Sequence, residues 1–417
     1  MTQHGPQLGI LGSDLRLGVN AFGTMIPSHR RWTIGLVVGT EDRWRDPHEE
    51  PSTRQRFVSG APIVETALSV PGGAVRWRVA VAAGPVGLVE IHNDSPAATA
   101  VAFVIRSDWA LNASHTEVSV GGDVVMKFPR PMTFGAAGRG ERSALDIAMR
   151  GAAERKGSWV TAGPNAEMVV LLPLGHGASV TVEVVLESDD PIRPTRYNLT
   201  QIAQGWEQQL TRGARIVLPD PVMNSATQVA RGLVVLAGAH NPSGATIAAL
   251  EDWGFDREAE LAWQSARFGQ RRVARSRAHP AEGRDAWDHL VALWSSMRGA
   301  AFLGRNAGHA PDWMSAVRDL VVLDRGRGHV ELLRLLPAEW AGAPLEVYDL
   351  PVRGGSISYA LRWHGMRPAL LWESRGVRKI TIPAVDPTFE TTEARGEILL
   401  QAPETAVPMT ELGASFS

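Results

Sequence analysis

The chain of 417 residues contains no cysteine, which excludes disulfide bonds, thiolate metal ligands and a cysteine nucleophile. No window approaches the roughly 18 uninterrupted apolar residues that a transmembrane helix needs. The first 30 residues lack a charged segment followed by a long apolar run, so we expect no signal peptide. A net charge of −2 provides no overall field to attract nucleic acid or an anionic membrane. These absences favour a cytoplasmic protein that binds neither.

Lysine is scarce as well, occurring only at positions 127, 156 and 379, so arginine supplies almost all of the basic charge. Because the arginines are scattered among acidic residues, they indicate a compositional bias rather than a nucleic-acid surface. Fourteen tryptophans stand against three tyrosines. An indole ring can stack on the apolar face of a sugar, but most tryptophans fill protein cores. The tryptophan content therefore agrees with sugar binding without establishing it.

The N-terminal half of the chain has the pattern of short β-strands. Segments 63–68, 75–81 and 181–186 alternate between apolar and polar residues or run apolar over the length of a strand. Gly72-Gly73 and Gly121-Gly122 lie between such segments and predict hairpin turns. Many short strands with almost no helical pattern predict a large antiparallel sandwich.

The periodicity then becomes helical. A single helix is expected over 198–213, with Asn198 as its cap, and Leu218-Pro219-Asp220-Pro221 ends that segment. Beyond it, apolar residues recur at spacings of three and four, which predicts about six helices. Their expected bounds are 222–238, 244–253, 257–268, 285–303, 311–323 and 328–336. Residues 337–417 return to strand patterns.

Several segments resemble parts of one enzyme architecture. Residues 350–365, continued by 367–373, look like the C-terminal β-module of bacterial glycoside hydrolases built on a six-hairpin (α/α) toroid. Residues 11–19 and 64–73 resemble the supersandwich domain of the same enzymes. Residues 283–294 resemble the toroid helix that begins with an acidic residue.

This resemblance implies a multidomain β + α fold in four parts. They are an N-terminal antiparallel β-supersandwich (1–197), a linker helix (198–221), a partial α/α toroid of about six helices (222–336) and a small C-terminal β-sandwich module (337–417). A complete toroid has twelve helices, so the toroid is expected to be truncated. Its exposed flanks would then need cover from the β domains or from a second copy in a homo-oligomer.

The expected site lies on the toroid face that carries the longer, more polar loops, 239–243 and 269–284, together with the segment 325–329. Glycoside hydrolysis needs a protonated acid and an ionised carboxylate on either side of the scissile bond. The candidate catalytic residues are Asp285, Glu282 and Asp288; the alternative is that Asp285 is only a helix N-cap with other acidic residues in the first turn. The candidate substrate-binding residues are His240, Asn241, His279, Trp287, Arg325 and His329. The histidines show no metal-ligand spacing, and we expect neither a metal nor a cofactor.

Two functions remain open from the sequence. In the first, the protein is a glycoside hydrolase that cleaves O-glycosyl bonds of an oligosaccharide. In the second, it is a catalytically inactive relative that binds carbohydrate or a protein partner. The second carboxylate of the resembled enzymes normally lies in the later half of the toroid, and no residue here corresponds to it.

Overall fold

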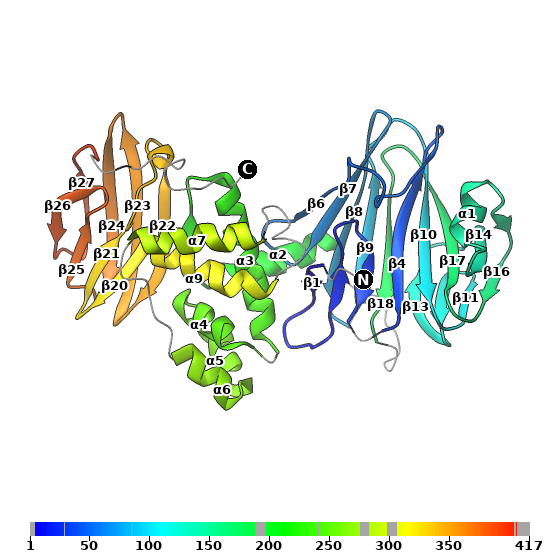
Figure 1. The fold of residues 1–417 in the computed structure, drawn as a ribbon, viewed down its shortest axis with the longest axis horizontal. Coiled ribbons are helices and arrows are strands. Elements are labelled where there is room, and N and C mark those ends of the chain that lie inside the picture. Colours follow the sequence, from blue (N-terminus) through cyan, green and yellow to red (C-terminus); the bar gives the residue numbers. More distant parts are fainter. Residues whose placement is uncertain are drawn as a thin grey trace. The chain divides into compact units, whose positions relative to one another are not determined.

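The computed structural model describes residues 5–28, 30–84, 86–187, 197–240, 242–275, 283–297, 307–403 and 406. The chain forms two compact units (Figure 1). Unit 1 comprises residues 1–58 and 62–205, and unit 2 comprises residues 59–61 and 206–417. The three candidate site residues Asn241, His279 and Glu282 lie outside the described residues.

Unit 1 is built from two nine-stranded sheets in which all neighbouring strands are antiparallel. The first contains β1 (Gln7–Leu8), β2 (Leu17–Val19), β3 (Met25–Pro27), β4 (Trp32–Gly39), β5 (Trp44–Arg45), β10 (Thr99–Ser107), β14 (Phe134–Arg139), β15 (Glu154–Arg155) and β17 (Ala166–Leu174). The second contains β6 (Arg54–Phe57), β7 (Val64–Val70), β8 (Gly73–Ala82), β9 (Val86–Asn93), β11 (Leu111–Ser114), β12 (Glu117–Val120), β13 (Asp123–Lys127), β16 (Ser158–Thr161) and β18 (Ser179–Val185). The expected turns at Gly72-Gly73 and Gly121-Gly122 are confirmed.

The two sheets of unit 1 pack face to face. The ring of Phe103 on β10 meets that of Phe128, which follows β13, edge to face at 5.3 Å. Behind the first sheet, the short helix α1 (Ala144–Met149) buries Leu145 and Ala148 against Val169 and its neighbours. Ser143 caps this helix by accepting a hydrogen bond from the amide of Asp146. Unit 1 is therefore a sandwich with one helix covering part of its outer face.

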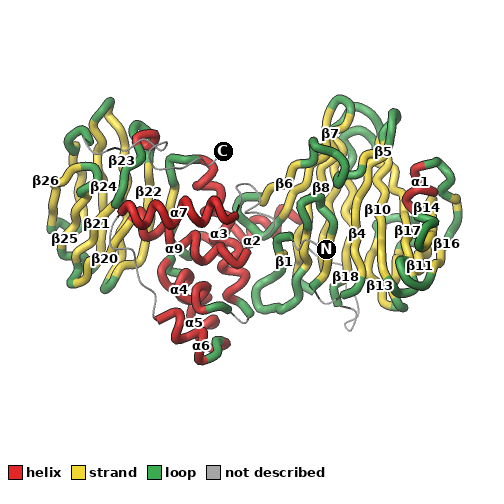
Figure 2. Tube along the Cα trace, viewed as in Figure 1, coloured by secondary structure: helices red, strands yellow, loops and turns green. Residues whose placement is uncertain are grey.

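Unit 2 begins with helices and ends with strands (Figure 2). Helix α2 (Leu199–Leu210) spans the boundary between the units. The others are α3 (Pro221–Gly238), α4 (Gly244–Asp252), α5 (Asp256–Ser265), α6 (Phe268–Arg275), α7 (Gly283–Met297) and α9 (Ala310–Val321), with short 3-10 turns at Ala307–His309 and Ala338–Trp340. Asp220 caps α3, and Pro221 occupies its first position, where a missing N–H costs nothing.

Tryptophans hold these helices together. Trp253 and Trp313 are fully buried. The indole N–H of Trp253 donates to the carbonyl of Met314 at 3.0 Å, and that of Trp313 donates to the hydroxyl of Thr227 at 3.1 Å. The core interpretation is thus confirmed for these two tryptophans.

The strands of unit 2 form two sheets. The five-stranded sheet has the order β19 (Arg215–Val217), β22 (Leu345–Val352), β23 (Gly355–His364), β24 (Arg367–Arg375) and β27 (Arg395–Leu399). The four-stranded sheet has the order β20 (Val322–Gly326), β21 (His329–Leu332), β25 (Lys379–Ile382) and β26 (Asp386–Thr391). Trp372 and Phe389 pack between them with ring centroids 5.7 Å apart. The protein is therefore a multidomain β + α structure.

Three local predictions were wrong. Residues 328–336 were expected to form a helix, but β21 occupies 329–332 because it pairs with β20 and, in parallel, with β25. The long polar loop expected at 269–284 contains α6 up to Arg275. Helix α7 begins at Gly283, so Asp285 lies within its first turn rather than capping it.

Candidate functional site

The two candidate catalytic carboxylates within the described residues lie on the surface of α7. Asp285 and Asp288 are both exposed. Asp288 accepts a hydrogen bond at 2.9 Å from Arg284, one helical turn earlier. This exposed pair is typical of a solvated helix face. Neither side chain has the apolar enclosure that surrounds a general acid.

The candidate substrate-binding residues do not form a single basin. Trp287 is fully buried, with its ring 5.9 Å from that of Trp340, so it offers no face to a sugar. His240 is exposed just after α3. Arg325 and His329 lie on the β20–β21 hairpin of the four-stranded sheet, not among the helices.

The contacts of that hairpin are structural. Arg325 pairs with Glu331 at 2.7 Å on the neighbouring strand. A ring nitrogen of His329 lies 3.0 Å from the hydroxyl of Thr381 on β25. Burial, followed by the charge of Lys379, lowers the pKa of His329. These residues stabilise the pairing of β21 with its neighbours.

The buried carboxylates of unit 1 are held in their ionised form. Burial acts to raise the pKa of Glu167, but the Ser143 hydroxyl, the Leu145 amide and Arg106 outweigh it, so the pKa is lowered. At Glu65, burial again acts to raise the pKa of the carboxyl, but its bonds to Arg78 and Arg56 outweigh burial and the pKa is lowered. Among the described residues, every carboxyl with a clear shift is shifted downward. None of those five has the raised pKa of a general acid.

Unit 1 has a hollow of about 700 Å³ beside Glu167, lined by residues of the β3–β4 turn, Arg106 and Asn165. Arg106 donates to Glu167 at 2.8 Å and Ser143 donates to it at 2.7 Å. The carboxylate is therefore satisfied by its own neighbours, and this hollow presents no unpaired reactive group at that position.

A second hollow of about 580 Å³ lies on the outward face of the five-stranded sheet. Two rows of cross-strand neighbours form it: Ala360, Leu371 and Glu397 are in register, as are Ser358, Glu373 and Arg395. We call it the sheet-face hollow. Because side chains alternate along a strand, these six point away from the buried face that holds Tyr359 and Trp372. It combines a small apolar floor with a hydroxyl and charged groups of both signs.

Tyr348 on β22 borders the sheet-face hollow. The guanidinium of Arg215 lies 4.4 Å from the centre of its ring, and its hydroxyl donates to Glu346 at 2.7 Å. Charged neighbours thus hold the side chain in place, Arg215 at the ring face and Glu346 at the hydroxyl. It is also one of the exposed large apolar side chains of the chain, at 37% exposure.

Tyr348 also borders a third hollow, of about 400 Å³, which we call the arginine pocket. Its lining residues are Ser59, Glu207, Leu210, Thr211, Gly213, Arg215, Gln228, Arg231, Tyr348 and Asp349. Apart from Ser59 and Gly213, they lie on or next to α2, β19, α3 and β22, and all belong to unit 2. Arg231 on α3 is buried at 4% exposure, whereas Arg215 is about half exposed.

Sequence reasoning missed the sheet-face hollow and the arginine pocket, although one signal was present. Thr227, Arg231 and Val234 share one buried face of α3 at spacings of four and three. A charged residue within such a stripe is almost never fully buried without a reason. The sheet-face hollow has no such signal, because its residues come from three strands whose register only the fold defines.

No group of three or more metal-ligating side chains occurs in the part of the chain that the structure describes. Over the same residues, none of the helices has the length and apolar character needed to cross a membrane.

Comparison with known proteins gives a fold likeness only. No family model and no curated protein matches the chain. Among solved structures, it is similar to a family GH92 alpha-mannosidase from Bacteroides thetaiotaomicron, with 11% identity and a TM-score of 0.34, over 56% of this chain and 38% of that one. The complex of that enzyme with mannoimidazole gives 11% identity and a TM-score of 0.34, over 58% and 39%. The chain thus spans about two fifths of the length of these structures.

Proposed function

We propose that the protein binds an oligosaccharide on the five-stranded sheet without hydrolysing it. The observation that carries this proposal is the sheet-face hollow, where Tyr348 adjoins an apolar floor and a charged rim. Its volume lies within the roughly 300–1,000 Å³ of small-molecule sites. A sugar presents one apolar C–H face and many hydroxyl groups. An aromatic ring beside hydrogen-bonding side chains is complementary to both.

The carboxylates of the sheet-face hollow favour binding over hydrolysis. Glu373 and Glu397 are exposed, and Glu373 lies directly opposite Arg395 on the neighbouring strand. Their oxygens can accept hydrogen bonds from sugar hydroxyls, but neither side chain has the apolar enclosure that surrounds a general acid.

The division of the chain proposed from the sequence fits this function. A β-sandwich of residues 1–197, a linker helix, a truncated toroid of residues 222–336 and a closing β-module from 337 would make a relative of the six-hairpin glycosidases that keeps the fold and uses its last module to hold glycan. The alternative, a hydrolase acting through Asp285 and Glu282, finds no support in the exposed position of Asp285.

A glycan array followed by a panel of aryl glycosides tests the proposal. We expect saturable glycan binding and no release of the aryl group. The variant Tyr348→Ala should weaken binding about five- to tenfold, the contribution of one aromatic contact. Tyr197→Ala, the same change at an exposed tyrosine of unit 1, should leave binding unchanged.

Turnover of any aryl glycoside would overturn the non-hydrolytic assignment. An array with no bound glycan would overturn the carbohydrate assignment and leave a protein partner as the ligand class to examine.

A further inference from the structure

Arg231 stands apart from the other buried arginines of the described chain. Four arginines are buried: Arg45, Arg231, Arg318 and Arg334. Arg45 has a carboxylate partner in Asp42 at 2.7 Å, and Arg318 has one in Asp319 at 3.6 Å. The positive charge of Arg334 is supported by Glu331 and Asp319. For Arg231, the described residues provide no ion pair.

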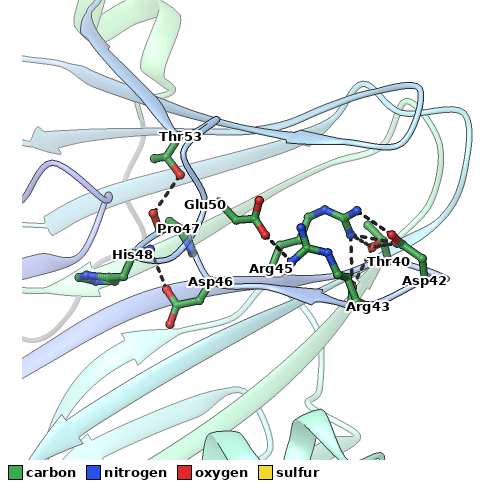
Figure 3. Close-up of polar contacts among 9 residues, drawn as sticks. All are labelled: Thr40, Asp42, Arg43, Arg45, Asp46, Pro47, His48, Glu50 and Thr53. Atoms are coloured by element: carbon green, nitrogen blue, oxygen red, sulfur yellow. Dashed lines mark hydrogen bonds and ion pairs between the residues drawn. The ribbon is translucent and has the colours of Figure 1, made fainter.

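Arg45, on β5, and the turn just before it show how this chain satisfies a buried guanidinium (Figure 3). Both oxygens of Asp42 accept hydrogen bonds from Arg45, at 2.9 and 2.7 Å, and the Thr40 hydroxyl accepts another. These bonds are the first cause of a lowered pKa at Asp42 and of a raised pKa at Arg45. The planar fork of arginine is matched there by a carboxylate from the same chain.

The groups that contact Arg231 directly are neutral, and the neighbouring charge that acts on it is that of Arg215. Its guanidinium donates to the side-chain oxygen of Gln228 at 2.8 Å and to the carbonyl of Leu210 at 2.5 Å. Its Nε–H is buried without an acceptor. The ring of Phe255 lies 5.8 Å from the guanidinium carbon. Burial, followed by the charge of Arg215, lowers the pKa of Arg231 to about 10.

A buried cation without a counter-ion is costly, and a like charge beside it adds to that cost. Leu210 is the last residue of α2, so its carbonyl and the Gln228 oxygen offset part of the cost with partial charges. They do not supply a full negative charge. Arg231 lines a hollow large enough for a small ligand group, and Arg215 lines it too.

We propose that the arginine pocket is a binding site for an oxyanion, the carboxylate or phosphoryl group of a small ligand, held between Arg231 and Arg215. Both groups match the two parallel N–H bonds of a guanidinium. Thr211, Gln228 and Ser59 line the same pocket and carry further polar groups. Glu207 and Asp349 also line it; their carboxylates oppose an anion there and favour one that carries hydroxyl groups as well.

The inference does not rest on the glycan proposal, because it concerns a different hollow and a charge rather than a sugar. Calorimetric titration of the full chain with inorganic phosphate and, separately, with acetate tests it, with sodium chloride at matched ionic strength as the reference. We expect one of the two anions to bind with one site per chain. A phosphate response identifies a phosphoryl ligand, and an acetate response identifies a carboxylate ligand.

Variants separate binding from structure. Arg231→Gln should weaken anion binding at least about tenfold, the value of a hydrogen bond to a charged group. Arg215→Gln should weaken it about threefold, because this arginine is exposed and screened. Since Arg215 bears little of the packing, its variant keeps the test valid if Arg231→Gln fails to fold. Arg375→Gln, an exposed arginine outside the pocket, should bind like the parent chain.

Absence of binding by both anions, or unchanged binding in the Arg215→Gln and Arg231→Gln variants, would overturn the site. If the protein binds neutral glycans on the array but binds neither anion, only the anion-site inference is contradicted. If it binds an anion but no glycan on the array, only the glycan proposal is contradicted.

Discussion

Arg45 in unit 1 and Arg231 in unit 2 are buried to similar extents, at 7% and 4% exposure, yet their charges are balanced in different ways. Arg45 meets Asp42 three residues away, so folding of a local turn completes the pair (Figure 3). Arg231 donates hydrogen bonds to the side chain of Gln228 and to the carbonyl of Leu210, and it lines the arginine pocket. The first arrangement stabilises the fold by itself. The second is complete only when a negative group arrives from outside.

The comparison extends to carboxylates. In unit 1, Glu65 has Arg56 and Arg78 at 2.7 and 2.6 Å, and Glu167 has Arg106 at 2.8 Å. The buried charges of that sandwich thus come with partners. Where a partner is missing in unit 2, we attribute the gap to a ligand rather than to the fold.

The largest expected effect comes from breaking a buried pair. Asp319→Asn would leave Arg318 without its nearest carboxylate, and we expect a loss of about 3 kcal/mol in the free energy of unfolding of unit 2. Urea denaturation followed by tryptophan fluorescence measures it. A loss below about 1 kcal/mol would show that a buried arginine here tolerates the absence of a counter-ion, which would weaken the argument from Arg231.

A matched pair of substitutions sharpens the contrast. Arg318→Met leaves Asp319 buried without its cation and should lower the free energy of unfolding by about 3 kcal/mol. Arg231→Met removes an unbalanced charge together with two hydrogen bonds, so in chloride buffer it should lower that free energy by about 1 kcal/mol or less. The same unfolding measurement applies to both variants. Equal costs would mean that Arg231 is as fully balanced as Arg318.

The paired carboxylates of unit 1 predict a dependence on acid. Because the folded pKa of Glu167 is lowered, its contribution to stability is present above the ordinary glutamate pKa of about 4.3 and is lost as the pH falls through the lower folded value. Glu167→Gln should therefore flatten the fall in stability over that acidic range. Thermal unfolding at a series of pH values measures the slope. Parallel curves for the two proteins would contradict the pairing.

The smallest expected effect comes from removing a negative charge at the edge of the arginine pocket. Glu207 is exposed and lines the pocket without an ion pair among the described residues, so its charge opposes an incoming anion. Glu207→Gln should raise anion affinity about twofold, since an exposed and screened charge contributes only a few tenths of a kcal/mol. Glu41→Gln, an exposed glutamate of unit 1, is the control. Weaker binding in Glu207→Gln would instead make Glu207 a ligand-contacting group.

Local signals in the sequence predicted much of the fold. Gly72, Gly121 and Gly122 form the turns between their strands because glycine readily adopts left-handed backbone, and Pro221 follows the Asp220 cap. The segment 328–336 was wrongly predicted to be a helix, whereas β21 occupies 329–332. Pairing of β21 with β25, fifty residues later in the chain, decides its structure, and no local window contains that information.

Local sequence signals predicted less of the candidate site than of the fold. Asp285 and Asp288 were chosen from an expected ring of helices, and Trp287 between them belongs to the core. The residues that gather around Tyr348 come from α2, β19, α3, β23, β24 and β27, so only tertiary structure brings them together. Arg231 alone carried a readable signal, as a charge within an apolar stripe.

Crystals of the full chain soaked in selenate, a phosphate-like anion with a strong anomalous signal, give the most direct test of the unbalanced arginine. We predict an anomalous peak in the arginine pocket, with selenate oxygens within about 3 Å of Arg231 nitrogens, and no peak in crystals of Arg231→Gln. A pocket that stays free of anomalous signal, in crystals where the anion binds elsewhere, would contradict the assignment of Arg231 to a ligand.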